Sequence, residues 1–260
     1  MPFDLQLAIN VVYPAANSAY QIMNVPAPVM PAGYELVAPI LADPQAALPA
    51  MLTADPQDHR IVNRMLLESN IFGLVAWNQS LGEALVAFRG AQTITDWIDA
   101  VETVPVPYLA VPGAGMVHMG FQLVYEHVRH NVAQLLINAC KGVKQILVTG
   151  HSLGGAVAIL NCFDIARNIT PGIVPVVYSL ASPRVGAPGF AGNFDRLIPV
   201  CNRIVNFMDV VPQVPFPPVY EHAGRETLVH GGFKPLDVAY AHLLTTYLAG
   251  LQKMRPGSGS

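Results

Sequence analysis

Gln145-Ile-Leu-Val-Thr-Gly-His-Ser-Leu-Gly-Gly-Ala156 joins a short apolar run to a glycine-rich turn near the middle of the chain. The run 145–149 is typical of a strand that a parallel sheet buries on both faces. It leads into Gly150-His-Ser-Leu-Gly154, and an apolar, helix-like segment follows. On such a strand-to-helix turn the two glycines make room, and the hydroxyl of Ser152 points off the sheet. The stretch therefore predicts a nucleophilic serine, with a glycine-rich turn that a serine merely caps as the alternative.

Segments of helix-like and strand-like character alternate on both sides of this turn. Helix-like spacing covers residues 60–69, 116–139, 157–166, 189–197 and 238–251, and strand-like runs cover 72–77, 84–88, 145–149, 174–180 and 203–207. This alternation predicts one α/β domain over residues 1–254, with a central, mostly parallel sheet flanked by helices. Within it, residues 1–54 are expected to wrap over the core. Residues 255–260 are expected to form a disordered tail or a remnant of cloning.

The composition restricts the class of protein. Of the 260 residues, 12% are charged and 52% are hydrophobic, which excludes a disordered chain. The net charge of −3 argues against a nucleic-acid partner. Two charge-free stretches, 5–34 and 103–125, are interrupted by prolines, so neither predicts a membrane-spanning helix. No Lys or Arg precedes Arg60, so we expect no secretory signal and a chain that is either cytoplasmic or the mature part of an exported protein.

The cysteines are odd in number and widely spaced. They are Cys140, Cys162 and Cys201. This pattern favours buried thiols over a disulfide framework or a zinc cluster, and no metal site is predicted.

A nucleophilic serine needs a base, and the base needs an acid that orients it. On this architecture they follow in the order Ser, Asp or Glu, His. Asp209 comes just after the strand-like run 203–207, so it is expected at the carboxyl edge of the sheet, where ligands gather in open parallel sheets. Asp164 and Asp195 lie in helix-like segments, where a solvated carboxylate is the ordinary explanation.

The histidines downstream of Ser152 are His222, His230 and His242. His222 lies in a Pro-rich loop and His230 closes a short apolar run, so either can be a surface or supporting residue. His242 begins an apolar, helix-like segment after a loop, where it can face back across the sheet edge. The spacing favours His242 over His230 only slightly and leaves the choice of base open.

Backbone donors for a developing oxyanion are predicted on two segments. Gly90 permits a sharp turn after the run 84–88, which directs the N–H of Ala91 toward the site. The second donor is the N–H of Leu153, at the start of the helix behind Ser152. An ordinary turn after an edge strand is the alternative for the first segment.

A short amphipathic helix is predicted just beyond this loop. Ile94, Trp97, Ile98 and Val101 recur at helical spacing on one face, and prolines follow. Beside an active site, such a helix can cover the cleft in water and turn outward on a lipid surface. A lid and a plain surface helix both fit the pattern.

These motifs together resemble the class 3 lipase family of the α/β-hydrolase superfamily. The matching segments run in family order between Ile61 and Leu251: Ala87-Phe-Arg-Gly90, Asp96-Trp97, Val117-His-Met-Gly-Phe121, Val148-Thr-Gly-His-Ser-Leu-Gly-Gly-Ala156, Ala181-Ser-Pro-Arg-Val-Gly186, Arg203-Ile-Val-Asn206, Asp209-Val-Val-Pro212 and Ala241-His-Leu243. The resemblance implies an α/β-hydrolase fold with a short lid helix. It also implies a cofactor-free enzyme that hydrolyses acylglycerols and related carboxylic esters.

The resemblance also implies roles for individual residues. Ser152 is the nucleophile, Asp209 the acid and His242 the base. The amides of Ala91 and Leu153 form the oxyanion hole, and the segment from Ile94 to Val101 is the lid. Many family members carry Ser or Thr at the position of Ala91, so only the backbone donor remains here.

Two further functions stay open on the sequence. One is an esterase of soluble or aryl esters, such as feruloyl esters, and the other is a non-catalytic lipid-binding protein. The presence of all three triad members favours an enzyme. Its expected partner is a lipid or ester substrate, bound in one interpretation at a lipid–water interface, and no protein partner is implied.

Overall fold

The structure is a computed structural model that describes residues 2–45, 47, 52, 54, 59–92, 104–234 and 237–254. Its strands are β1 (Glu35–Leu41), β2 (Ile71–Asn78), β3 (Glu83–Phe88), β4 (Val106–Pro107), β5 (Met116–Val117), β6 (Gln145–His151), β7 (Val176–Leu180), β8 (Cys201–Asn206) and β9 (Arg225–Val229). Its helices are α1 (Leu5–Leu7), η1 (Ala8–Val12), α2 (Tyr13–Gln21), α4 (His59–Glu68), α6 (Met119–Ala139), α7 (Leu153–Asp164), η2 (Ile165–Ile169), α8 (Pro188–Leu197), η3 (Val211–Gln213), α9 (Val238–His242) and α10 (Leu244–Lys253).

The strand predicted at residues 145–149 is β6, the central strand of a seven-stranded sheet in the order β1-β2-β3-β6-β7-β8-β9. Strands β3, β6, β7, β8 and β9 pair in parallel, and β1 and β2 add an antiparallel edge. The predicted mostly parallel sheet is confirmed. Because parallel strands end at one edge, the loops that follow β3, β6 and β8 gather there.

Alternate side chains of the central strands enter two separate hydrophobic cores. In β3, Val86 and Phe88 pack in one core, whereas Leu85 and Ala87 pack in the other. All four are buried. A strand buried on both faces needs a continuous apolar run, which explains why these strands lack the alternation of a half-exposed strand.

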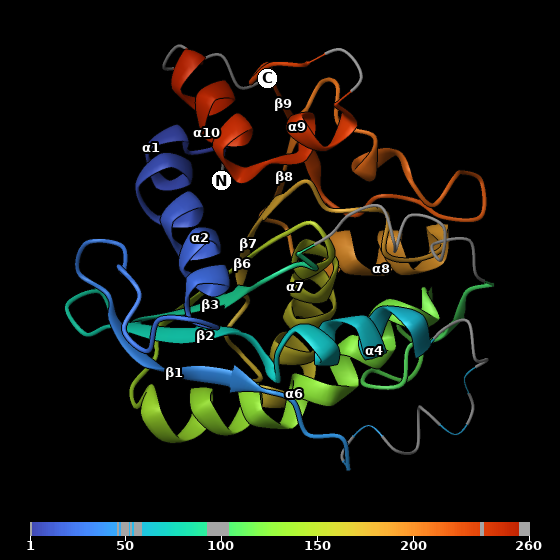
Figure 1. Ribbon diagram of the computed structural model, residues 1–260. Coiled ribbons are helices and arrows are strands. Elements are labelled where there is room, and N and C mark those ends of the chain that lie inside the picture. Colours follow the sequence, from blue (N-terminus) through green and yellow to red (C-terminus); the bar gives the residue numbers. More distant parts are fainter. Residues whose placement is uncertain are drawn as a thin grey trace.

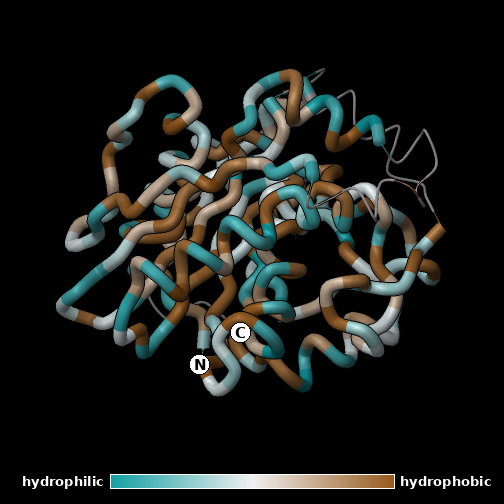
Figure 2. Tube along the Cα trace, turned by 90° about the horizontal axis from the view of Figure 1, so that it is seen from below, coloured by the Kyte–Doolittle hydropathy of each residue, from teal (hydrophilic) through white to brown (hydrophobic). Residues whose placement is uncertain are grey.

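Helices cover both faces of the sheet (Figure 1). Helices α4, α6 and α7 pack together on one face, and the N-terminal helices lie with α10 on the other. Figure 2 shows that the more hydrophobic stretches of the trace pass through the centre of the molecule. Among the described helices, none is both long and apolar enough to cross a membrane.

The first 54 residues contain regular structure that the sequence analysis did not resolve. Helix α2 packs over β2, β3 and β6, and β1 pairs with β2 along the edge of the sheet. Four small residues of α2, Ala15, Ala16, Ser18 and Ala19, are buried against the sheet. Small side chains let the helix approach the sheet closely. Because they are small, their helical spacing gives only a weak hydrophobic pattern in the sequence.

Two predicted helices have different boundaries in the structure. The helix predicted from Met116 begins at Met119, because Met116 and Val117 pair with β4. The last helix is interrupted at Leu243, whose ψ of 139° is extended, so α9 ends at His242 and α10 begins at Leu244. The interruption frees His242 from the interior of a continuous helix.

The remaining sequence predictions on this scaffold have clear outcomes. Cys140, Cys162 and Cys201 are free and buried, as predicted.

Asp164 is not the solvated carboxylate that its position suggested: it is 1% exposed and binds Tyr125 and Arg129. The long side chains of α6 reach it across the helix packing, a contact that the local pattern does not reveal. Residues 255–260 lie outside the described part of the chain.

Candidate active site

Ser152 lies on a strained turn between β6 and α7. Its φ of 59° and ψ of −129° are rare for a residue with a side chain, and such strain is retained where the surrounding structure enforces it. A Cβ atom at Gly150 would lie 2.1 Å from the carbonyl oxygen of Gly154, and one at Gly154 would lie 2.4 Å from that of Phe88. Only glycine fits at both positions, so the turn brings Ser152 to the carboxyl edge of the sheet.

Asp209 and His242 form a buried pair at the same edge. The His242 Nδ1 lies 2.7 Å from Asp209 Oδ2, and the two side chains are 2% and 0% exposed. The same oxygen accepts a hydrogen bond from the Tyr247 hydroxyl at 2.6 Å, and Asp209 Oδ1 accepts one from the Val211 N–H at 3.0 Å. Burial raises the pKa of Asp209, but these hydrogen bonds outweigh it and hold the pKa below the ordinary value. Asp209 is therefore an ionised acceptor that orients the imidazole.

The two atoms expected to exchange a proton are both buried and unbonded. Neither Ser152 Oγ nor His242 Nε2 has a hydrogen-bond partner among the described residues. Most buried polar atoms are paired, so atoms left free at one edge of the sheet are consistent with a reaction site.

The other downstream candidates are placed elsewhere. The ring nitrogen Nε2 of His222 lies 2.7 Å from the carbonyl oxygen of Pro212, and burial with nearby Arg203 lowers its pKa to about 3. His230 is exposed, and its ring lies tilted against that of Phe207, with the ring centroids 5.4 Å apart. Asp195 is exposed and accepts a hydrogen bond from the Gly224 N–H. The structure thus pairs Asp209 with His242 and with neither of the other two histidines.

The loop after β3 is held by a buried arginine of the motif Ala87-Phe-Arg-Gly90. Arg89 is 1% exposed, and its Nη1 donates to Glu68 Oε2 at 2.6 Å and to the Gly90 carbonyl at 3.0 Å. The other carboxylate oxygen of Glu68 accepts from the Gln92 N–H at 3.0 Å. Burial lowers the pKa of Arg89, and the charge of Glu68 opposes that shift. The pair therefore holds the backbone on both sides of Ala91.

Replacing Glu68 by glutamine is expected to lower the free energy of unfolding by about 3–5 kcal/mol, because it leaves the buried Arg89 guanidinium without a counter-charge. Urea denaturation followed by circular dichroism measures this loss. Glu35→Gln is the matched control, since Glu35 is exposed at the edge of β1. Equal stability of the two variants would show that the ion pair does not hold the loop.

A pocket of about 260 Å³ opens at the proposed site. Its lining brings together the base, the loop after β3 and the N-terminal helix: Asn17, Tyr20, Ala91, Gln92, His151, His242, Leu243, Leu244 and Thr245. Ala91 and His242 thus border one space. Leu153 begins α7 beside Ser152 and is buried, which places its N–H at the positive end of that helix.

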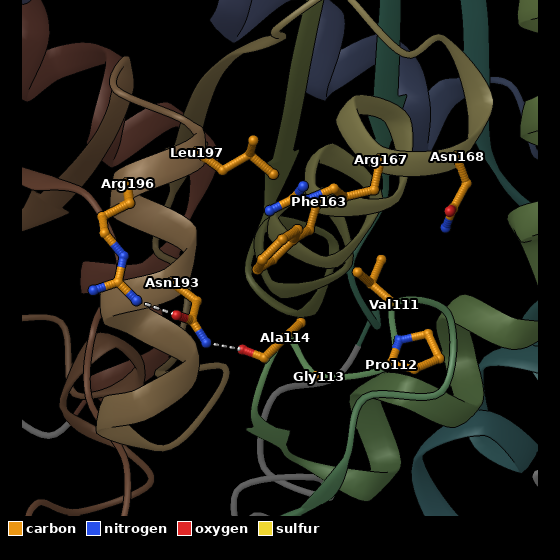
Figure 3. A pocket seen from close by; sticks show the side chains of 10 residues that line it. All are labelled: Val111, Pro112, Gly113, Ala114, Phe163, Arg167, Asn168, Asn193, Arg196 and Leu197. Atoms are coloured by element: carbon orange, nitrogen blue, oxygen red, sulfur yellow. Dashed lines mark hydrogen bonds between the residues drawn. The ribbon is translucent and has the colours of Figure 1, made fainter.

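A larger cavity, of about 590 Å³, lies away from these residues (Figure 3). It is bordered by the last turns of α7 and α8, which lead toward the opposite edge of the sheet. Asn193 spans its wall by bonding both Arg196 and the Ala114 carbonyl. Neither the turn at Ser152 nor the Asp209–His242 pair lines it, so its size does not make it the reaction site.

The predicted lid, with Ile94, Trp97, Ile98 and Val101, lies outside the described residues. Within the described residues, no group of three or more His, Cys, Asp or Glu side chains is arranged to hold a metal ion.

The parallel sheet, the strained strand-to-helix turn and the helices on both faces are those of an α/β-hydrolase fold. The family model of class 3 lipases matches residues 85–219, just over half of the chain, and the chain belongs to the class 3 lipase family.

Individual relatives agree with this assignment. The chain is 31% identical to phospholipase A1-II 6 of Oryza sativa subsp. japonica, over 75% of the chain and 58% of that protein. It matches the solved triacylglyceride lipase of Rhizomucor miehei with a TM-score of 0.55 and 34% identity, covering 60% of each chain. A further solved structure, of a triacylglycerol lipase described as having a serine protease triad as its catalytic centre, matches with a TM-score of 0.54 and 34% identity, again over 60% of each chain. The chain spans roughly half the length of the curated relatives it matches.

Sequence reasoning missed three residues that support this site. Tyr247 bonds Asp209, Glu68 bonds Arg89, and Tyr20 reaches the ring of His151. Each lies on a helix distant in sequence from its partner. Tyr20 and Tyr247 lie in apolar segments, where an aromatic residue is ordinarily interpreted as core, so no local signal marked them.

Proposed function

We propose that this protein hydrolyses carboxylic ester bonds of acylglycerols and related lipid esters through an acyl-enzyme on Ser152. His242 acts as the general base and acid, and Asp209 orients it. The N–H groups of Ala91 and Leu153 form the oxyanion hole, and no metal or cofactor takes part.

The pairing of Asp209 with His242, next to the strained serine, is the observation that carries the proposal. The 2.7 Å contact occupies Nδ1 of the imidazole, so its Nε2 is the nitrogen available for a reacting proton. The strained turn presents the serine at the edge where this pair lies. We expect the hydrogen bond between Ser152 Oγ and Nε2 to form in the substrate complex, because catalytic hydrogen bonds often tighten only there.

In the acylation half of the reaction, Ser152 Oγ attacks the ester carbonyl carbon while Nε2 of His242 takes the hydroxyl proton. The carbonyl oxygen becomes negative and accepts hydrogen bonds from the amides of Ala91 and Leu153. The intermediate then collapses, the bond from carbon to the alcohol oxygen breaks, and His242 protonates the departing alcohol.

In the deacylation half, water attacks the acyl-enzyme and gives its proton to His242. The carboxylic acid leaves, and the proton returns to Ser152 Oγ. Throughout, Asp209 remains ionised and stabilises the imidazolium, which its depressed pKa favours.

The surface around the pair supports an apolar substrate. Large hydrophobic residues that are 41–61% exposed flank the pair along the chain: Phe207, Met208 and Val210 beside Asp209, and Leu243 beside His242. Leu243 also lines the pocket of the site. Exposed apolar residues beside a reaction site fit a lipid–water interface better than a dissolved, polar ester. The predicted lid at residues 94–101 belongs to this proposal.

The rate of hydrolysis is expected to rise with acyl chain length and to jump when the ester passes its solubility limit. The exposed hydrophobic residues beside the site then contact a lipid–water interface. A series of p-nitrophenyl esters and triglycerides, each measured below and above that limit, tests this. Feruloyl esters provide the control substrates.

A smooth curve through the solubility limit, with feruloyl esters as the best substrates, would favour an ordinary esterase. Absence of hydrolysis with every ester, together with no labelling by a fluorophosphonate, would instead leave a non-catalytic lipid-binding protein.

A further inference from the structure

Tyr20 of helix α2 links three segments of the proposed active site. Its hydroxyl oxygen lies 2.9 Å from Nδ1 of His151, the residue before the nucleophile. The other ring nitrogen of His151, Nε2, lies 2.8 Å from the backbone carbonyl oxygen of His242. The Tyr20 hydroxyl also meets the loop after β3, since a Cβ atom at Gly90 would lie only 2.6 Å from it. The turn at Ser152, the backbone of His242 and the loop at Gly90 are therefore connected through the side chains of Tyr20 and His151.

The direction of each hydrogen bond in the series from Tyr20 through His151 to His242 follows from which groups can only accept. A backbone carbonyl can only accept, so Nε2 of His151 must carry a proton. In a neutral imidazole, Nδ1 is then an acceptor, and the Tyr20 hydroxyl must donate to it. The lone pairs of that hydroxyl remain for the backbone N–H of Gly90, whose hydrogen bond lowers the pKa of Tyr20 against the larger, raising effect of burial. The contacts thus specify one tautomer of His151.

His151 is neutral under the conditions in which the proposed base works. It is 6% exposed, and burial together with the neighbouring ring of His242 lowers its pKa to about 3. The two ring centroids lie 4.6 Å apart. A neutral ring at this distance supports His242 without placing a second positive charge beside the imidazolium that forms during the reaction.

We propose that Tyr20 is a positioning residue for the reaction: its hydroxyl donates to Nδ1 of the Nε2–H tautomer that the His242 carbonyl requires, and it thereby holds the His151 ring, the backbone of His242 and the loop at Gly90 in place relative to Ser152. The inference rests on the proposed function and extends it to a segment outside the family match, which begins at residue 85. The N-terminal helix is then part of the site and more than a cover over the core.

The tautomer follows directly from this arrangement and can be observed in the unaltered protein. ¹H–¹⁵N spectra of the histidine rings should show His151 protonated at Nε2 and unprotonated at Nδ1. In Tyr20→Phe, Nε2 should stay protonated because the His242 carbonyl still accepts from it, but Nδ1 loses its donor, and its ¹⁵N signal should move toward that of an acceptor without a hydrogen bond. An Nδ1–H form in the unaltered protein would overturn the proposal, whether or not the variant folds.

The kinetic test is Tyr20→Phe with a dissolved p-nitrophenyl ester. We expect kcat to fall about 10- to 100-fold, because small displacements of reacting groups have effects of this size, and KM to stay within about threefold. Tyr178→Phe is the matched control. The Tyr178 hydroxyl accepts a hydrogen bond from the Asp4 N–H at 2.9 Å, so it anchors the same N-terminal segment without touching the site.

The outcomes separate this inference from the proposed function. If Ser152→Ala eliminates hydrolysis but Tyr20→Phe keeps the full kcat, the inference is wrong and the proposed function stands. An equal loss in Tyr178→Phe and Tyr20→Phe would show that anchoring of the segment matters and the hydrogen bond from Tyr20 to His151 does not. If Ser152→Ala keeps its activity, the proposed function fails, and the Nδ1 signal of His151 in Tyr20→Phe still decides the role of Tyr20 toward His151.

Discussion

Ser152→Ala is expected to reduce ester hydrolysis by about 10⁴-fold or more, because no other group in the site can form the acyl-enzyme. The fold should persist. Alanine at position 152 adopts the same strained backbone, with its φ of 59°, as serine does. The change also removes a buried hydroxyl that has no hydrogen-bond partner among the described residues. Hydrolysis of p-nitrophenyl esters, the thermal midpoint and fluorophosphonate labelling are measured on the same preparation.

Ser179→Ala is the matched control for this experiment. Ser179 lies on β7 opposite Gly150, and its hydroxyl is likewise buried without a partner among the described residues. It should keep its activity and its labelling, whereas Ser152→Ala loses both. Undiminished hydrolysis in Ser152→Ala would refute the assignment of the nucleophile, and equal losses in the two variants would point to a packing effect.

His242→Ala is expected to lower kcat by a similar factor, of order 10⁴, because the proton of Ser152 then has no acceptor. Its effect on stability should be smaller, about 1–3 kcal/mol, since Asp209 retains its hydrogen bonds from Tyr247 and the Val211 N–H. Steady-state kinetics and urea denaturation measure the two effects. Added imidazole should restore part of the activity if the truncated side chain leaves room for it.

His230→Ala is the control, because His230 is exposed and lies in the same stretch between Asp209 and the end of the chain. It is expected to change kcat by less than about twofold, as ordinary surface substitutions have small effects. A severe loss in His230→Ala with a mild one in His242→Ala would reassign the base. The contrast tests the choice that sequence spacing left nearly even.

Local sequence predicted the central part of this fold well. The run 145–149, the glycines around Ser152 and the apolar helix behind it specify a strand, a tight turn and a helix within a few residues of one another. Each of these features depends on neighbours along the chain, such as the backbone contact that only glycine tolerates at position 154. The mostly parallel sheet followed from the alternation of such units.

Long-range contacts were harder to predict. The burial of Asp164 depends on contacts with Arg129 and Tyr125 of α6. The anchoring of the loop after β3 depends on Glu68 of α4. Neither carboxylate has a local pattern that distinguishes it from a solvated one. Likewise, the N-terminal helix meets the sheet through small side chains, which leave a weak periodicity in the sequence.

The sequence by itself determined the class of this protein: an α/β chain with a strained serine turn, an aspartate after a later strand, and a histidine near the end. Those features are local or follow chain order, so they are visible without coordinates. Only the tertiary structure decided which histidine contacts Asp209, and that Tyr20 reaches His151 from a helix 131 residues away in sequence. Such contacts arise where packing brings distant segments to one sheet edge, and spacing along the chain carries no record of them.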